Sequence, residues 1–261
     1  GDDYEPISKL GDVYNLGGHT LVCGDCTDPK NWPTHKEGTM LFTSPPYMAT
    51  NASLSANTHM KQKYLHDEIE GDGFASLMDR FTKIAIKKTE QAFINTQMLA
   101  DNKKIIIDYM YAFKDYFCDL LIWDKISTQP AMAANVCNSL FEIVIVMSDV
   151  NNSRSMRFAG FRGTQDNIIR SPPNRGNVFA SEHSAVMSIE FAIQMIDVFA
   201  KKADLVVDCF GGVGTTLVAC ALHKKRTWLI EMSPRYCDII RRRWARYAED
   251  NGLDIGDGLN G

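Results

Sequence analysis

The sequence lacks the features that mark several large classes of protein. None of its apolar runs is long enough to span a membrane, and it does not start with a charged segment followed by an apolar one, as a secretory signal would. It has no internal repeat and no low-complexity tract. Its net charge of −4 argues against a protein that coats nucleic acid without specificity. A chain of 261 residues with 45% hydrophobic content is therefore expected to form one globular, cytoplasmic domain with a small insertion.

The cysteines form no recognisable metal or disulfide pattern. Their number, seven, is odd, and several lie within apolar stretches, which favours a reduced protein. Cys23 and Cys26 have C-x-x-C spacing, but no second pair completes a zinc site and the segment precedes a loop rather than a helix. We expect neither a metal site nor a redox pair there.

The most informative segment that is present is Ser44-Pro45-Pro46-Tyr47, which follows the apolar run 40–43. Two prolines cannot continue a strand, because neither has an N–H for the ladder. A hydroxyl, rigid carbonyls and an aromatic ring therefore gather where a strand ends, which is where ligands bind in open α/β sheets. Such a group can accept hydrogen bonds from an exocyclic amine while the ring stacks on a base. The alternative is a Pro-Pro turn with a packed tyrosine.

Strand and helix patterns alternate along most of the chain, which predicts an α/β fold with a mostly parallel sheet and helices on both faces. The expected strands are 20–23, 40–43, 92–95, 120–124, 142–147, 205–208 and 227–231, and the expected helices are 74–84, 105–117, 189–199, 214–222 and 236–247. The expected organisation is a linker or arm at 1–18, a main domain at 19–247 that contains a loop at 48–72 and an insertion at about 149–180, and a polar tail at 248–261.

A glycine-rich turn follows the predicted strand 205–208. Glycines at such a turn allow a tight bend and a close approach to a ligand. Glu231 ends the next strand, where an acid that binds ribose hydroxyls would lie in a nucleotide-binding unit. The third glycine of the dinucleotide fingerprint is missing, and no Gly-Lys-Ser/Thr follows for a phosphate loop. What fits is a nucleoside without a pyrophosphate, such as adenosine linked to a small zwitterion.

Two motifs resemble those of a known family. Asp208-Cys-Phe-Gly-Gly-Val-Gly-Thr-Thr216 is similar to the S-adenosylmethionine motif D-x-F-x-G-x-G-T-T of DNA methyltransferases that act on amino groups, and Thr43-Ser-Pro-Pro-Tyr47 is similar to their catalytic motif D/N/S-P-P-Y/F. The catalytic motif comes first, as in the permuted β group. The segment 11–25 is similar to the start of phage and prophage methyltransferase domains that often follow a ParB-like domain. The resemblance covers 11–247 and implies a Rossmann-like methyltransferase fold with a seven-stranded, mostly parallel sheet and permuted motif order.

The resemblance also implies roles for individual residues. Ser44 and the Pro45 carbonyl would hold the target amine, and Tyr47 would stack on the base. Glu231 would accept from the ribose hydroxyls and Asp25 from the adenine amine. The full implied set is catalytic Ser44, Pro45, Pro46 and Tyr47, and cofactor-binding Asp25, Thr43, Asp208, Phe210, Gly211, Gly212, Gly214, Thr215, Thr216, Glu231, His183 and Ser184. The segment 182–190 departs from the family's H-P-T-x-K-P-x-E, because both prolines and the lysine are absent.

The implied reaction is methyl transfer from S-adenosylmethionine, without a metal, to the exocyclic amine of a base flipped out of double-stranded DNA. In the family, Ser-Pro-Pro-Tyr is associated chiefly with N4 of cytosine, so cytosine is favoured and N6 of adenine is the alternative. The insertion would recognise the target through its arginines. They are Arg154, Arg157, Arg162, Arg170 and Arg175.

Several alternatives stay open. An RNA methyltransferase would share the cofactor motif, a non-catalytic subunit would bind the cofactor without transfer, and a nicotinamide oxidoreductase would need a pyrophosphate site. The missing initial methionine suggests either a tag scar or a domain cut from a longer protein with an upstream domain. A homodimer, a partner subunit or an accompanying restriction enzyme would fit the family. Trp123 is expected in the core rather than in the site.

Overall fold

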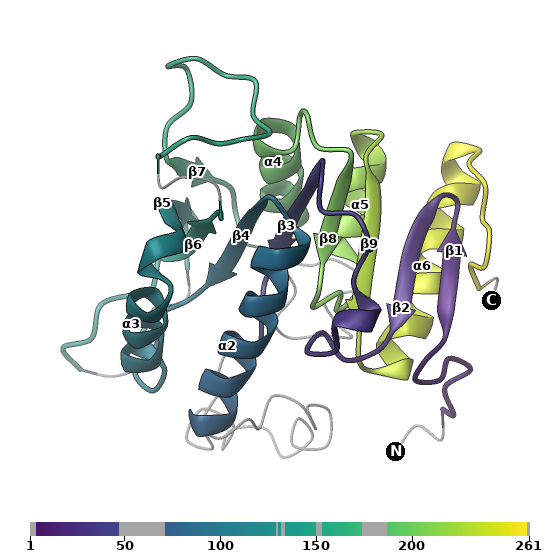
Figure 1. Ribbon diagram of the computed structural model, residues 1–261, viewed down its shortest axis with the longest axis horizontal. Helices are drawn as coiled ribbons and strands as arrows, with labels where there is room; N and C mark the ends of the chain where they lie inside the picture. The colour runs from purple at the N-terminus through teal and green to yellow at the C-terminus, as the bar shows by residue number, and fades with distance from the viewer. Residues whose placement is uncertain are drawn as a thin grey trace.

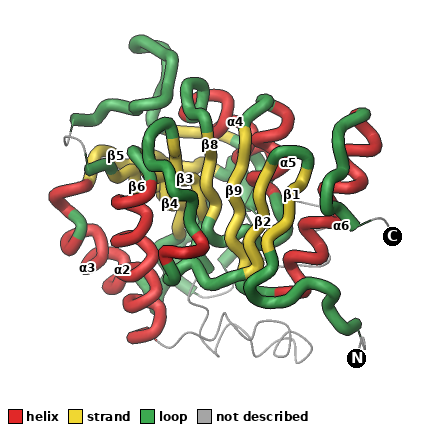
Figure 2. The backbone as a smooth tube through the Cα atoms, turned by 45° about the vertical axis from the view of Figure 1, so that its right-hand side comes forward, coloured by secondary structure: helices red, strands yellow, loops and turns green. Residues whose placement is uncertain are grey.

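A computed structural model describes residues 4–46, 71–128, 130–131, 134–149, 153–173 and 187–259. In this part of the chain, nine strands form one sheet that has helices on both faces (Figures 1 and 2). The strands are β1 (Val13–Leu16), β2 (His19–Cys23), β3 (Thr39–Thr43), β4 (Gln91–Thr96), β5 (Phe117–Asp124), β6 (Phe141–Met147), β7 (Ile168–Arg170), β8 (Leu205–Asp208) and β9 (Arg226–Glu231). The helices are α2 (Gly71–Lys88), α3 (Lys103–Ala112), α4 (Ile189–Phe199), α5 (Thr215–Leu222) and α6 (Pro234–Asn251), with 3-10 turns at Pro29–Asn31 and Lys114–Tyr116.

The sheet is mixed, and the prediction of a seven-stranded, mostly parallel sheet was wrong in strand number. The strand order is β1-β2-β9-β8-β3-β4-β6-β5-β7. β1 is antiparallel to β2, and β6 is antiparallel to both β4 and β5, while the other neighbours are parallel. The β1–β2 connection is short enough for a hairpin because Gly17 and Gly18 adopt positive φ angles of 58° and 93°. The two strands that the sequence pattern missed are β1 and β7.

The two motif-bearing strands lie side by side at the centre of the sheet. β3 pairs with β8 in parallel, with Leu41 opposite Val207. Side chains on β3 alternate between the two faces, so Leu41 packs in the cluster under α2 and α3 whereas Met40 and Phe42 pack in the cluster under α4. A third cluster joins α6 to β1, β2 and β9. The pairing brings 39–43 and 205–208 together although they lie far apart in sequence.

Trp123 lies in the core, as expected. Its side chain is 4% exposed and stacks on Phe191 with ring centroids 4.3 Å apart. The predicted helix 105–117 ends earlier, at Ala112, because Phe117 already begins β5.

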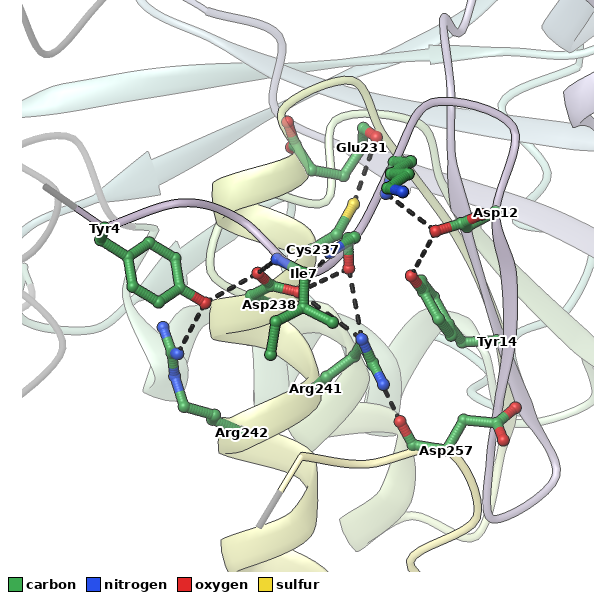
Figure 3. A network of polar contacts seen from close by, with 12 residues as sticks. Tyr4, Ile7, Asp12, Tyr14, Glu231, Cys237, Asp238, Arg241, Arg242 and Asp257 are labelled. Carbon is green, nitrogen blue, oxygen red and sulfur yellow. Dashed lines mark hydrogen bonds and ion pairs between the residues drawn. The ribbon is translucent and has the colours of Figure 1, made fainter. Parts of the chain in front are cut away.

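The segment 1–18 was expected to be a linker or arm, but its described part belongs to the fold. The buried carboxylate of Asp238 on α6 accepts hydrogen bonds from the Tyr4 hydroxyl at 2.7 Å, from the Ile7 N–H at 2.7 Å and from the Ser8 hydroxyl at 2.6 Å (Figure 3). Arg242 donates to the Tyr4 hydroxyl from the other side. This N-terminal clamp fixes residues 4–8 against α6.

The expected polar tail at 248–261 is likewise part of the fold where it is described. α6 continues to Asn251. Beyond it, the Asp257 carboxylate accepts from the Asn15 N–H at 2.7 Å, and the Asp257 N–H donates to the Asn15 carbonyl. The Arg241 guanidinium donates to the Asp257 carbonyl at 2.9 Å (Figure 3). The C-terminal segment therefore lies along the outer side of β1 and hydrogen-bonds to it.

Replacing Asp238 by alanine is expected to lower the free energy of unfolding by about 3 kcal/mol, because the buried N–H and hydroxyl of Ser8 and two partly buried donors lose their acceptor. Burial alone would raise the pKa of Asp238, but the hydrogen bonds from Ser8, Tyr4 and Ile7 hold that pKa below its usual 3.8. The stabilisation is therefore present above pH 4 and is lost as the pH falls through the pKa of the folded state. Denaturant titration at pH 7 measures the loss, and Asp250→Ala on the exposed face of α6 is the control. Equal stability of the two variants would contradict the clamp.

Candidate active site

The turn between β8 and α5 bends tightly because two of its glycines occupy the left-handed region. Gly212 has φ +53° and Gly214 has φ +79°, and the Gly214 N–H donates to the Gly211 carbonyl at 2.8 Å. A Cβ on Gly214 would lie 3.3 Å from Ile240 Cγ1 on α6. Only glycine fits this position without strain, so the turn keeps its tight bend at the end of β8.

Asp208 joins the two sequence motifs. Its Oδ1 accepts from the Thr43 hydroxyl at 2.6 Å and from the Phe210 N–H at 3.1 Å, and its Oδ2 accepts from the Thr216 hydroxyl at 2.7 Å. Burial raises the pKa of this carboxyl to about 6, although the three hydrogen bonds oppose the rise. Thr43 immediately precedes Ser44, so the hydrogen bond to Asp208 fixes the Pro-Pro segment relative to the glycine-rich turn.

Glu231 ends β9 beside that turn. One carboxylate oxygen accepts from the Gly212 N–H at 2.8 Å and the other from the Ser233 N–H at 2.8 Å. Burial raises the pKa of Glu231 to about 7, and the nearby charge of Asp208 contributes to the rise. A carboxylate with a raised pKa at the carboxyl end of a strand is suited to accept hydrogen bonds from a polar ligand.

Asp25 lies next to Glu231 at the same edge of the sheet. Cys23 at the end of β2 pairs with Glu231, and the Gly24 N–H donates to the Glu231 carbonyl at 2.9 Å. The Asp25 side chain is exposed and accepts from the Thr27 N–H at 2.7 Å. The described residues predicted to bind the cofactor therefore converge at one end of the sheet, at the carboxyl ends of β2, β3, β8 and β9.

Phe210 packs into this edge from the glycine-rich turn. Its ring contacts Phe81 of α2 edge to face, with centroids 5.1 Å apart. Thr215 and Thr216, which begin α5, are buried. The buried Arg243 donates to the Val213 carbonyl at 2.9 Å and so supports the turn from α6.

Ser44 is half-buried and lies directly after β3. Its hydroxyl accepts from the Asn95 side-chain amide at 3.4 Å. That amide also donates to Glu142 at 2.7 Å, and Glu142 forms an ion pair with Lys125 at 2.7 Å. None of these three residues was predicted to belong to the site, although a polar residue inside each of the buried strands β4 and β6 was a signal for Asn95 and Glu142. Pro45 is buried and Pro46 half-buried.

Among the arginines expected to contact DNA, those that the structure describes do not lie together. Arg154 forms an ion pair with Asp119 at 3.2 Å, and Arg157 with Glu90 just before β4 at 2.5 Å. Asp119 lies near the beginning of β5, so both pairs are at the amino ends of these strands, opposite the edge that carries Ser44. Arg162 is exposed in the same loop, which Figure 1 shows at the top, away from the carboxyl end of β2.

Arg170 ends β7 at the carboxyl edge of the sheet. It forms an ion pair with Asp124 at 3.4 Å, and the neighbouring Ser171 N–H donates to the Asp124 carbonyl. Tyr47, Arg175, His183 and Ser184 lie outside the described residues, as do 48–70 of the predicted loop and 150–152 and 174–180 of the predicted insertion.

Neither a metal-binding cluster nor a membrane-spanning helix is present among the described residues. No cluster of three or more histidine, cysteine, aspartate or glutamate side chains there is arranged to hold a metal ion. No helix in the same part of the chain has the length and apolar character needed to cross a membrane.

The fold is similar to those of solved DNA methyltransferases. The PvuII DNA methyltransferase, named as cytosine-N4-specific, is 16% identical with a TM-score of 0.66, and the match covers 90% of this chain and 89% of that one. TTHA0409 of Thermus thermophilus, described as a candidate DNA modification methylase, is 20% identical with a TM-score of 0.61, over 87% of this chain and 95% of that one. M1.HpyAVI in complex with SAM is 15% identical with a TM-score of 0.56, over 86% of this chain and 98% of that one.

The family follows from a sequence profile. No curated protein sequence matches the chain significantly. The profile of the N6/N4 DNA methylases matches residues 39–242, which include both the Pro-Pro segment and the glycine-rich turn. Because the match extends over more than half of the chain, the protein belongs to the N6/N4 family of DNA methylases.

Proposed function

We propose that the protein transfers a methyl group from S-adenosylmethionine to the exocyclic amine of a base in double-stranded DNA. The observation that carries the proposal is the 2.6 Å hydrogen bond between Thr43 and Asp208, because it joins the Pro-Pro segment to the glycine-rich turn at one edge of the sheet. N4 of cytosine is the favoured acceptor, supported by Ser44 and by the similarity to a cytosine-N4-specific enzyme, and N6 of adenine is the alternative. The order of the motifs is that of the permuted β group.

The residues at this edge fit S-adenosylmethionine. A Cβ on Gly212 would meet nothing nearer than the Phe210 carbonyl at 3.8 Å, so the turn leaves open space there, and Glu231 offers carboxylate oxygens suited to the ribose hydroxyls. Asp25 is exposed beside it and would accept from the adenine amine. Two of the similar solved structures contain the same cofactor. His183 and Ser184 remain proposed contacts for the cofactor carboxylate.

The chemistry asks mainly for positioning. When bound, the cofactor supplies an electrophilic methyl group on a sulfonium. The Ser44 hydroxyl and the Pro45 carbonyl would accept the two amine hydrogens and so align the nitrogen lone pair with that methyl group. The proton leaves after transfer, when the nitrogen is cationic and acidic, so a strong general base is not needed. Tyr47 would stack on the flipped base.

The position of the arginines narrows the proposed DNA contacts. Of the predicted arginines that the structure describes, Arg170 is the one at the carboxyl end of its strand, the end of the sheet that carries Ser44. Arg154 and Arg157 lie at the opposite edge in ion pairs, which makes them poor candidates. Arg175 remains a proposed contact. A homodimer, a partner subunit or an upstream domain would extend the DNA-binding surface.

The proposal is tested by incubating the protein with labelled S-adenosylmethionine and unmethylated plasmid DNA, followed by mass spectrometry of the nucleosides. We expect N4-methylcytosine. N6-methyladenine would overturn the choice of base, and methylation of RNA alone would overturn the choice of substrate. Cofactor binding without any transfer would identify a non-catalytic subunit. Calorimetry with S-adenosylhomocysteine and NAD separates a methyltransferase from an oxidoreductase.

The affinity for S-adenosylhomocysteine is expected to rise with pH around pH 7. Burial raises the pKa of Glu231 to about 7, and the ribose hydroxyls require the ionised carboxylate as acceptor. Below this pKa the proton competes with the ligand, so the Kd should increase by up to tenfold for each unit by which the pH falls. Calorimetry between pH 5.5 and 8.5 measures the slope. The variant Glu231→Gln should bind more weakly and show no such slope, and a slope that it keeps would exclude Glu231 as its source.

A further inference from the structure

A chain of polar contacts leads from Ser44 into the sheet. The side-chain amide nitrogen of Asn95 on β4 lies 3.4 Å from the Ser44 hydroxyl and 2.7 Å from Glu142 Oε2 on β6. Glu142 Oε1 lies 2.7 Å from the Lys125 ammonium, directly after β5. The chain therefore crosses three neighbouring strands, all near the end that carries the proposed site.

The chain is buried. Asn95 is fully buried, the Glu142 side chain is 6% exposed and the Lys125 side chain 12% exposed. An ion pair at such a place loses much of its hydration, and apolar side chains of similar size would stabilise the sheet as well or better. The pairs at the opposite edge differ, because their arginines are 74% and 43% exposed. Stability alone therefore does not explain why the Glu142–Lys125 pair is buried near Ser44.

The contacts fix the direction of the Asn95 amide. An ionised carboxylate only accepts hydrogen bonds, so the amide nitrogen and not the oxygen must face Glu142. The second hydrogen of the same nitrogen then faces the Ser44 hydroxyl. The Lys125 ammonium pairs with the other oxygen of Glu142 and lies 5.6 Å from the ring centroid of the core residue Trp123, which supports its position.

We propose that Asn95, Glu142 and Lys125 are positioning residues that hold the Ser44 hydroxyl in the one orientation that accepts from the target amine. The inference rests on the proposed function of Ser44. With a neutral side chain at 142, the Asn95 amide has no fixed direction, and Ser44 has two hydrogen-bonding arrangements instead of one. Long contacts such as the one of 3.4 Å commonly shorten when a substrate binds.

The main experiment compares Glu142→Gln with wild type in single turnover, at saturating cofactor and DNA. We expect the rate of methyl transfer to fall about tenfold, the difference between a charge-assisted and a neutral hydrogen bond. The Kd for S-adenosylhomocysteine should change less than twofold, since Glu142 lies away from the glycine-rich turn. Lys125→Arg keeps the cation and should retain most of the rate. The double variant Glu142→Gln/Lys125→Met leaves no charge unpaired and should show the same slow transfer in a folded protein.

Asp119→Asn is the matched control, because it neutralises an acid of similar exposure in an ion pair at the opposite edge. It should transfer at the wild-type rate. A wild-type rate of methyl transfer in Glu142→Gln would overturn the inference. So would losses of transfer rate and cofactor affinity that are the same in Glu142→Gln and in Asp119→Asn.

A second measurement does not depend on activity. The side-chain amide signal of Asn95 in a nitrogen–proton NMR spectrum should move in Ser44→Ala and in Glu142→Gln, and should stay in place in Asp119→Asn. If the wild-type protein transferred no methyl group, the proposed function would fail. The Asn95 signal would still show whether Asn95, Ser44 and Glu142 are linked as inferred. The inference would be overturned if the Asn95 signal moved in neither Ser44→Ala nor Glu142→Gln.

Discussion

The variant Asp208→Ala is expected to lower the free energy of unfolding by about 3 kcal/mol at pH 5 and to weaken cofactor binding at least about tenfold. Three donors, the buried hydroxyls of Thr43 and Thr216 and the partly buried Phe210 N–H, lose their common acceptor, and each loss costs about 1 kcal/mol. The glycine-rich turn and the Pro-Pro segment also lose the contact that joins them. Denaturant titration and calorimetry with S-adenosylhomocysteine measure the two effects.

The effect of Asp208→Ala on stability should shrink as the pH rises. Burial raises the pKa of Asp208 from 3.8 to about 6 in the folded protein. A carboxyl group with a raised pKa stabilises the fold most below its unfolded pKa, and this contribution falls, by up to about 3 kcal/mol, as the pH rises through 6. The difference between wild type and Asp208→Ala is therefore smaller at pH 8 than at pH 5. A difference that grows with pH would contradict the assignment.

Asp208→Asn is the matched control. The asparagine oxygen can keep the hydrogen bonds from Thr43 and the Phe210 N–H, and its amide nitrogen can donate to the Thr216 hydroxyl, which is able to accept. Asparagine also carries no charge that burial would penalise. We expect its stability to lie within about 1 kcal/mol of wild type at pH 8. If Asp208→Asn were as unstable as Asp208→Ala, the hydrogen bonds would not be the source of the effect.

The central part of the fold could be predicted from the sequence because its signals are local. The run at 205–208 and the glycines after it specify a buried strand and a tight turn, and β8 and α5 lie where they were expected. β3 also lies where a strand was expected, and it pairs in parallel with β8. β1 and β7 were missed because they are short and each has one fully buried side chain, so no periodicity marks them.

The contacts that depend on distant residues could not be predicted. Asp238 binds Ser8 across 230 positions, and no local pattern announces such a pair. The placement of the arginines shows the same limit. The arginines are close together in the sequence. The segment that contains them, however, first passes the amino ends of the parallel strands near Glu90 and reaches their carboxyl ends only at Arg170. A count of charges along the sequence says nothing about the edge at which each charge lies.

The variant Ser44→Ala is expected to slow methyl transfer in single turnover about a hundredfold. Removing one preorganised hydrogen-bonding group from a reacting centre commonly has an effect of this size. The Kd for S-adenosylhomocysteine should stay within about twofold, because the glycine-rich turn follows β8 and Glu231 ends β9, whereas Ser44 follows β3. Rapid-quench measurement with labelled cofactor gives the rate, and calorimetry gives the Kd.

The matched control for Ser44→Ala is Ser155→Ala, since Ser155 is an exposed serine in the loop at the opposite edge of the sheet. It should transfer at the wild-type rate. Losing rate and cofactor affinity equally in Ser44→Ala would place Ser44 in the cofactor site rather than at the target amine. A selective loss of rate, together with a smaller selective loss in Glu142→Gln, would instead order the polar chain by distance from the reacting nitrogen, with Ser44 in contact and Glu142 acting through Asn95.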